Sequence, residues 1–412
     1  MGSGMVVAAS QEIRCGMKPP HPRERRGLWL GPMPSLAALA ELPALSPAAV
    51  LWEQGFFAGL KAQGFELTVV SHRPEPLWPR GRLMPGVRPA PADVSFPTSV
   101  VGHTNAPGLR ARSLARAYEH EVIELTRTEA YAFVASFNPL PWHLAAATAG
   151  VRQHGPPWVS FLLDDVLHDP TLERYARATR LAAGHVILSA AAAERITKLM
   201  PGAPVLHLDG AIDRWRGDDL ESARPAQPYV VYSGAHTEEA GMSLLVAAIP
   251  LVAADVMFTI TGDRGRHAGL RQLMARDARV QTVGWVSPAT LDEICRSATA
   301  FLNPRPPAHG LSLASFPSKL MTYLAYGKPA VSTWTPGLAD AYKDLLLVAD
   351  GETPRAFAAA IDRAVSMDIP SRDLLRRKIR AFLVPGRLWE TQGLRFANFL
   401  DQRITRGDNA AR

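Results

Sequence analysis

Two cations and an expected helix start lie close together between Phe301 and Gly337. A short apolar strand is expected to end at Asn303-Pro304-Arg305, and Phe316-Pro317-Ser318-Lys319 is expected to open a helix. Because a helix N-terminus carries free N–H groups and a partial positive charge, a lysine in the first turn is mildly unfavourable unless an anion binds there. Lys319, with Arg305 on the preceding loop, therefore predicts an anion site whose usual occupant is phosphate. The alternative is that both are ordinary solvated side chains.

The segments on either side of these cations predict the elements that position them. The helix presents an apolar face made of Leu320, Met321, Leu324 and Ala325. Gly327 is expected to end it, and the next strand is expected to begin at Pro329. Strand, loop, helix and strand in this order are typical of a parallel α/β sheet.

The runs NPR, FPSK, YLAYGKPAVST and PGLADAY resemble the donor-binding segment of nucleotide-sugar glycosyltransferases with the GT-B architecture, and in particular the large retaining family 4. The resemblance is strongest over residues 229–367 and fainter over residues 28–213. It implies an α/β fold in which two Rossmann-like domains face a cleft. It also implies transfer of a sugar from a nucleotide-diphosphate donor to a hydroxyl acceptor with retention, with no metal and no cofactor beyond the nucleotide-sugar co-substrate.

In that family this helix start cradles the donor diphosphate, and two glutamates seven residues apart contact the donor sugar and the ribose. The matching positions here hold Ala314 and Thr322, and the positions of two further donor-side cations hold Ala235 and Ala240. Three residues are predicted to be catalytic: Arg305 and Lys319, which would stabilise the leaving phosphate, and Asp165, which has the chemistry of a general base. It implies that the donor contacts come from the second half of the chain: Gly234, Arg264, Trp285, Ser315, Phe316, Pro317, Ser318, Lys319 and Thr322.

For two of these donor residues, the surrounding sequence gives a further indication of their role. Arg264 lies in a basic loop punctuated by Gly262 and Gly265, so it is a candidate phosphate contact. Trp285 follows a strand that the resemblance places beside the nucleotide base. A tryptophan in the hydrophobic core is the alternative.

The first half of the chain carries the expected acceptor residues. Strands are expected to end just before Asn138 and Asp164, and ligands of open α/β sheets bind at the carboxyl ends of strands. Asn138, His143 and Asp164 are therefore predicted to contact the acceptor, and Asp165 and His143 have the chemistry of a general base. A helix-capping aspartate and a surface histidine are the alternatives.

Composition describes a globular protein that contacts anions. The 412 residues are 47% hydrophobic and 20% charged, with a net charge of +7 from dispersed arginines. Dispersed charge suits a nucleotide-sugar or a lipid surface, and no nucleic-acid-binding pattern is present. Cys15 and Cys295 form no disulfide framework or zinc motif. No apolar run is long enough to span a bilayer, and no secretory signal is recognised. A cytoplasmic protein is therefore expected, and membrane association on the cytoplasmic face is left open.

The predicted organisation has five parts. Residues 1–26, which begin with a tag-like remnant, are expected to be disordered, residues 27–213 to form the acceptor-side domain and residues 214–228 the linker. Residues 229–370 are expected to form the donor-binding domain, and residues 371–412 helices that cross back to the first domain, broken at Pro385-Gly386. The stretch from His72 to Pro107, with Trp78, Arg80 and Arg82, is expected to be an irregular acceptor-side loop for which a peripheral membrane contact is an alternative.

Other functions stay open at this point. The same frame suits a non-catalytic partner that has lost donor chemistry, a nucleotide-sugar epimerase, a sugar phosphorylase or a membrane-docked scaffold.

Overall fold

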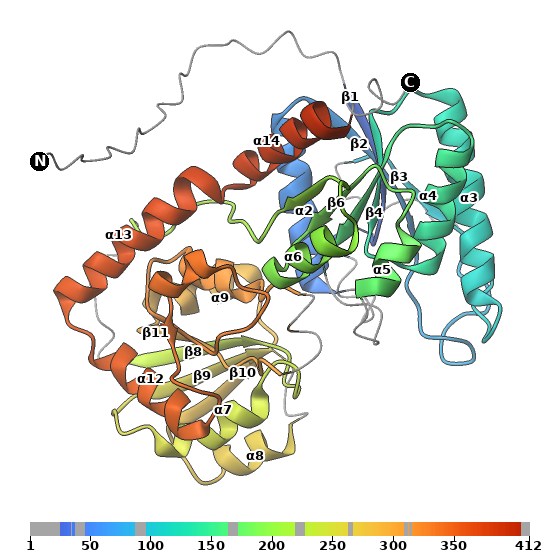
Figure 1. Cartoon of the computed structure of the whole chain (residues 1–412). Coiled ribbons are helices and arrows are strands. Elements are labelled where there is room, and N and C mark those ends of the chain that lie inside the picture. Colours follow the sequence, from blue (N-terminus) through green and yellow to red (C-terminus); the bar gives the residue numbers. More distant parts are fainter. Residues whose placement is uncertain are drawn as a thin grey trace, which may run out of the picture.

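The computed structural model describes residues 25–33, 35–37, 46–86, 96–163, 172–218, 227–262, 267–308, 312 and 315–404. Two α/β domains, each built on a parallel sheet, are joined by a long C-terminal helical arm (Figure 1). This confirms the predicted fold class of two Rossmann-like domains. None of the helices described is both long and apolar enough to span a membrane.

The first domain contains a sheet of seven described strands in the order β3-β2-β1-β4-β5-β6-β7. The strands are β1 (Arg25–Leu30), β2 (Phe65–His72), β3 (Thr98–Val101), β4 (Phe133–Phe137), β5 (Trp158–Leu162), β6 (Gly184–Ile187) and β7 (Val205–His207). The helices between them are α2 (Pro47–Ala62), α3 (Arg110–Thr128), α4 (Pro141–Arg152), α5 (Leu172–Ala178) and α6 (Ala190–Leu199).

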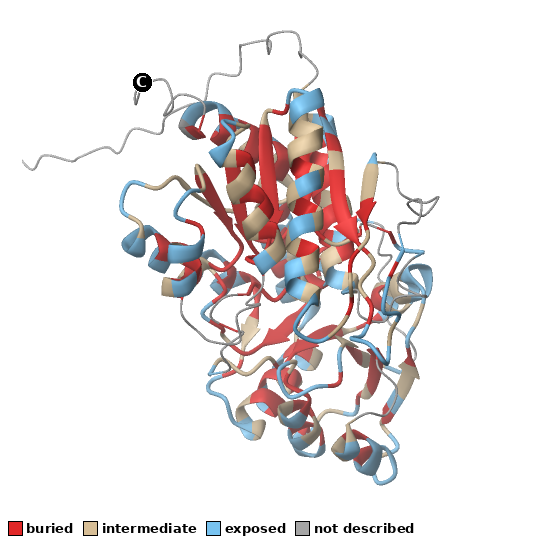
Figure 2. Cartoon of the chain, turned by 90° about the vertical axis from the view of Figure 1, so that its right-hand side faces the viewer, coloured by how far each residue is buried: buried red, intermediate tan, exposed pale blue. Residues whose placement is uncertain are grey.

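The central strand β1 is buried on both faces because its side chains alternate between two cores. Trp29 packs with Phe56 of α2 on one face, while Leu28 and Leu30 pack with Tyr118 of α3 on the other. The sheet is therefore sandwiched between helices, and its strands lie in the buried interior of the domain (Figure 2).

The second domain has a sheet of six described strands in the order β10-β9-β8-β11-β12-β13. The strands are β8 (Tyr229–Gly234), β9 (Met257–Gly262), β10 (Val280–Gly284), β11 (Ala300–Asn303), β12 (Ala330–Ser332) and β13 (Leu347–Val348). The helices are α7 (Met242–Ala248), η1 (Ile249–Leu251), α8 (Ala268–Met274), α9 (Pro288–Ser297), α11 (Lys319–Leu324), η2 (Asp340–Leu345) and α12 (Pro354–Ser366).

The C-terminal arm returns from the second domain to the first (Figure 1). It consists of α13 (Ile369–Gly386), α14 (Trp389–Phe399) and η3 (Leu400–Ile404). The rings of Trp389 and Phe396 pack against those of Trp52 and Phe56 on α2, with centroids 5.7 and 5.4 Å apart. Since α14 covers a hydrophobic face of the first sheet, the arm is part of the core of both domains.

Several boundaries differ from the sequence prediction. The expected disordered segment ends early, because Arg25 and Arg26 already pair with Phe65 and Glu66 in the sheet. The stretch from 72 to 107, expected to be irregular, contains the strand β3. This strand has only four residues, which are too few to form a recognisable pattern in the sequence. Pro385 lies inside α13, and the break falls at Arg387 and Leu388, because Ile212 pairs with Leu388 there.

Candidate active site

The candidate site lies at the point in the second sheet where the order of the strands reverses, between β8 and β11. From β8 the chain builds β9 and β10 on one side and then β11, β12 and β13 on the other. Ligands of open α/β sheets bind outside the carboxyl ends of the strands at such a point. Gly234 ends β8 and Asn303 ends β11, so the residues that follow these strands border the site.

Lys319 projects into this point from α11. Its ammonium nitrogen lies 4.2 Å from the centroid of the Tyr232 ring, and a Cβ added to Gly234 would lie 2.9 Å from that nitrogen. Burial, together with the positive charge of Arg305, lowers the pKa of Lys319 to about 7. Among the described residues no carboxylate forms an ion pair with Lys319. The site therefore holds a partly buried lysine whose charged form an anion would stabilise.

Arg305 is the second cation, and its guanidinium is fixed by hydroxyl groups. Its Nε donates to Ser312 Oγ at 3.3 Å, and its Nη2 donates to Ser315 Oγ. Its backbone carbonyl accepts a hydrogen bond from the Thr333 hydroxyl. These hydroxyl partners fix the orientation of the guanidinium, and a guanidinium held in a fixed orientation suits a role in binding phosphate.

Glycines end the strands β8 and β9 beside Lys319. Gly234 has φ 144° and Gly262 has φ 117°, values that L side chains rarely adopt. A Cβ on Gly262 would lie 2.0 Å from the carbonyl oxygen of Gly234. Gly234 therefore permits the close approach of Lys319, and Gly262 permits the close approach of the two strand ends.

The segment Phe316-Pro317-Ser318-Lys319 contributes both to the contact between the domains and to the candidate donor site. Phe316 and Pro317 are buried, and the Phe316 ring lies 5.6 Å from that of Tyr342 and faces Gly210 of the first domain. Ser315 is buried against Arg305, whereas Ser318 and Thr322 are exposed. Phe316 therefore packs between the domains, and the side chains available to a donor are those of Ser318, Lys319 and Thr322.

The helix that Lys319 opens is shorter than its sequence pattern implies. α11 has six residues, and Ser318 before it already has helical dihedral angles. The amides of Leu320 and Met321 donate to the carbonyls of Pro317 and Ser318 at 2.9 and 3.1 Å. The two cationic side chains, more than free amides, therefore define the anion site.

Trp285 is the remaining donor-side residue that the structure describes. Trp285 is 66% exposed, which rules out the alternative that it is a core tryptophan, and it follows the edge strand β10. Its indole is free to stack on a planar group. Arg264 and Ala314 lie outside the described residues.

On the acceptor side, Asn138 lies at the switch point of the first sheet, between β1 and β4. It has φ 56°, and its side-chain Oδ1 accepts a hydrogen bond from the amide of Leu163 at 2.8 Å. His143 is buried, and its Nδ1 lies 2.9 Å from the carbonyl oxygen of Phe137. Burial lowers the pKa of His143 to about 4. The expected alternative of a surface histidine is therefore wrong, and Asp164 and Asp165 lie outside the described residues.

Three residues at the site were not predicted from the sequence. Tyr232 supplies the ring beneath Lys319, and the hydroxyl of Tyr323 accepts from the amide of Ser233 at 2.8 Å. His236 is buried behind the strand ends, with Nε2 3.3 Å from the carbonyl of Thr261. The spacing of Lys319 and Tyr323, one helical turn apart, is the only signal that could have linked one of them to the site.

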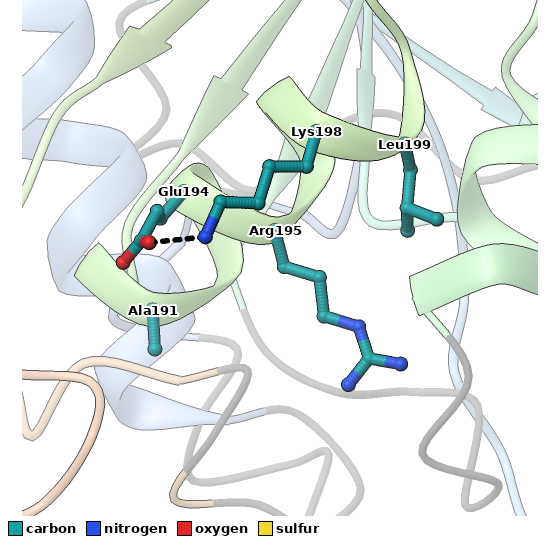
Figure 3. A pocket seen from close by; sticks show the side chains of 5 residues that line it. All are labelled: Ala191, Glu194, Arg195, Lys198 and Leu199. Carbon is teal, nitrogen blue, oxygen red and sulfur yellow. Dashed lines mark hydrogen bonds and ion pairs between the residues drawn. The ribbon is translucent and has the colours of Figure 1, made fainter.

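Two other features do not belong to this site. Among the described residues, no group of three or more histidine, cysteine, aspartate or glutamate side chains is placed to hold a metal ion. A hollow of about 460 Å³ lies on α6, and of the charged residues that line it, Lys198 pairs with Glu194 at 2.6 Å (Figure 3). Arg195, which also lines the hollow, pairs with Glu173 of α5.

Comparison with known proteins agrees with this geometry. Residues 227–367, which carry the candidate site, match the family "Glycosyl transferases group 1". No curated protein matches the chain. The matched domain and the shared two-domain fold support a glycosyltransferase with the GT-B architecture.

Solved structures share the fold at low sequence identity. Sucrose-phosphate synthase from Thermosynechococcus elongatus has a TM-score of 0.64 at 14% identity, with 94% of this chain and 100% of that chain covered. Anabaena HepE in complex with UDP-glucose has a TM-score of 0.62 at 15% identity, covering 91% and 99%. Trehalose 6-phosphate synthase from Burkholderia multivorans has a TM-score of 0.65 at 13% identity, covering 94% and 99%.

Proposed function

We propose that the protein transfers a sugar, with retention, from a nucleoside-diphosphate donor to a hydroxyl acceptor, and that Lys319 and Arg305 bind the donor diphosphate. The observation that carries the proposal is the partly buried Lys319 beside the glycine that ends β8. A diphosphate placed there would contact both cations, and its negative charge would offset the burial of the lysine.

This arrangement supplies what the chemical step requires. As the bond to the sugar breaks, negative charge grows on the departing diphosphate, and fixed cations in a site with little water stabilise it most. Arg305 is held by Ser312 and Ser315, so little reorganisation is needed during the reaction. The acceptor hydroxyl would enter from the first domain. His143 is neutral and buried, so we assign it a structural role next to Asn138.

The donor nucleotide is also part of the proposal. Solved complexes of HepE hold UDP and UDP-glucose, and we take a UDP-sugar as the first donor to test. Trp285 is exposed after β10 and is a candidate for stacking on the base. We propose that the reaction needs no metal and that the protein works in the cytoplasm.

The test is a thermal-shift and calorimetric titration with UDP, GDP and ADP, using the whole chain and Lys319→Met. A nucleotide at one hundred times its Kd is expected to stabilise the wild type by about 2.7 kcal/mol. Lys319→Met should retain the fold and lose most of that shift. Lys343→Met is the matched control, because Lys343 also lies over an aromatic ring, 5.4 Å from the centroid of Trp334, but away from the strand ends. Equal shifts in all three proteins would contradict the assignment of the site.

The open alternatives give different products. A nucleotide-sugar epimerase would change the sugar without an acceptor, and a phosphorylase would require free phosphate. Incubation with UDP-glucose and an acceptor panel, followed by analysis of released UDP and of the anomeric configuration of the product, separates them from retaining transfer.

A further inference from the structure

A cluster of exposed apolar side chains lies on the loop that follows β2. Leu77, Trp78, Leu83 and Met84 are 43, 48, 44 and 62% exposed, and Leu109 at the start of α3 is 53% exposed. We call these five residues the apolar patch. Single exposed apolar residues are common, but a group of them close together marks an interaction surface.

Buried polar groups hold this loop in shape. The fully buried Asn105 donates through Nδ2 to the carbonyls of Pro76 and Arg82 at 2.7 and 3.0 Å. Its backbone accepts from the amide of Trp78 at 3.1 Å and donates to the carbonyl of Leu83 at 2.7 Å. The backbone around the apolar patch is thus fixed by buried hydrogen bonds, while the apolar side chains stay exposed.

A second clamp ties the loop to α3. The buried carboxylate of Glu75 accepts from Arg73 Nε at 3.0 Å and from the amide of Arg82 at 2.9 Å. The carbonyl of Glu75 accepts from Arg110 Nη1 of α3 at 3.1 Å. Leu109 therefore belongs to the same surface as the loop.

Positive charge surrounds the apolar patch. Arg80 is exposed on the loop, as is Arg82, whose Nε lies 3.7 Å from the Glu75 carboxylate. Arg112 and Arg116 are exposed on α3 at three and seven residues beyond Leu109, on the same helix face. Glu75 is the one acidic residue between positions 73 and 86, and it is buried. The exposed charge on the loop is therefore positive.

We infer that the apolar patch, together with Arg80, Arg112 and Arg116, docks the protein onto an anionic lipid bilayer. Tryptophan, leucine and methionine side chains enter the boundary between headgroups and acyl chains, while arginines bind the anionic headgroups. The apolar patch lies at the edge of the first sheet where the strands have their carboxyl ends. The same edge contacts the second domain, because the amide of Ala190 of α6 donates there to the carbonyl of Gly337. Docking would bring the bilayer beside the acceptor side of the cleft. Only this last consequence rests on the proposed function, since docking does not require a donor.

The experiment is co-sedimentation of the whole chain with phosphatidylcholine vesicles that contain or lack phosphatidylglycerol. Binding to the anionic vesicles is expected, together with weakening at high salt. Arg80→Glu should lower the partition coefficient more than fivefold, since loss of one arginine alone corresponds to about 1 kcal/mol. Trp78→Ser combined with Met84→Ser should also reduce binding at least tenfold, because serine at these positions cannot insert into the apolar part of the bilayer.

Controls keep the test sharp. Leu374→Ser removes an equally exposed leucine from α13, and Arg180→Glu reverses an exposed arginine elsewhere in the first domain; both should bind like the wild type. Nucleotide-induced thermal shifts show that each variant is folded, and they keep failure of docking distinct from failure of donor binding. Absence of sedimentation with anionic vesicles, or equal binding to neutral vesicles, would overturn the inference. So would a concentration-dependent dimer in ultracentrifugation that the Trp78 and Met84 changes abolish, because a second copy would then be the partner.

Discussion

The ammonium of Lys319 lies over the ring of Tyr232, 4.2 Å from its centroid, at the end of the central strand of the second sheet. Tyr232 also donates through its hydroxyl to the carbonyl of Ala235 at 2.6 Å, so the ring is fixed on the loop that follows the strand. The lysine is thereby aimed at the strand ends with an aromatic face behind it. Cation–π contact supports a charge that burial disfavours, and it leaves the remaining N–H groups for an anion.

Loss of either cation is expected to slow the reaction strongly. Lys319→Ala and Arg305→Ala should each lower kcat/KM for the nucleotide-sugar by about 10² to 10³, which corresponds to about 2.7 to 4 kcal/mol of transition-state stabilisation. Steady-state kinetics with saturating acceptor measures this. Lys343→Ala is the control and should leave kcat/KM unchanged. If both site variants kept wild-type turnover, the cations would not be part of the chemistry.

Diphosphate binding is expected to take up a proton above neutral pH. The pKa of Lys319 is lowered to about 7, so the lysine is mostly neutral at pH 8, and a bound anion would favour its protonated form. Titration at pH 8 in buffers of different ionisation enthalpy should show uptake of close to one proton, falling toward zero below pH 6. Lys319→Met should show none. A wild-type uptake that stays the same in this variant would assign the proton to another group.

The same pKa makes a prediction for the free protein. The lysine binds its proton more weakly in the folded chain than in the unfolded chain, whose ordinary value is 10.5. Stability therefore falls as pH drops from about 10.5 to 7, and the loss is complete below 7. Lys319→Met should be more stable than the wild type at pH 6 in urea unfolding, with a smaller difference at pH 10. A constant difference across this range would contradict the lowered pKa.

Glycine at position 234 is expected to be required for both stability and binding. Its φ of 144° and the closeness of Lys319 leave no room for a Cβ. Gly234→Ala should cost about 1 to 3 kcal/mol of unfolding free energy and weaken nucleotide binding, because the lysine must move. Gly86→Ala serves as the control, since nothing lies within 4 Å of the added carbon. Wild-type affinity in Gly234→Ala would show that the lysine does not need its observed position.

The junction between the domains is expected to depend on Asp209. This buried carboxylate accepts from the Tyr342 hydroxyl at 2.9 Å and forms an ion pair with Arg387 at 2.8 Å. It thus joins the first domain to the second and to the break between α13 and α14 in the C-terminal arm. Asp209→Ala should cost about 3 to 5 kcal/mol because Arg387 loses its partner. Asp340→Ala, at an exposed carboxylate, should have little effect. Urea unfolding measures both, and similar midpoints for the two variants would be the contrary result.

Much of this structure is encoded locally. Apolar residues at helical spacing in 320–325 and the glycine at 327 predicted α11 and its end, and alternating strands and helices predicted two parallel sheets. The charges at positions 305 and 319 were visible in the sequence because a lysine at a helix start is chemically unusual. These features depend on neighbours within a few residues, so their signal is contained in the chain itself.

Tertiary structure alone decided which side chains meet. Lys319 reaches Tyr232 because α11 packs against a strand that lies 87 positions earlier, and no local pattern reports that approach. Trp285 was compatible with a core position by its type, yet the edge position of β10 leaves it exposed. The sequence by itself was enough to predict two parallel α/β sheets, the two cations of the site and the C-terminal helices. Their distances, the lowered pKa of Lys319 and the outward face of the apolar patch depend on packing between distant segments, because burial and contact are properties of the folded whole.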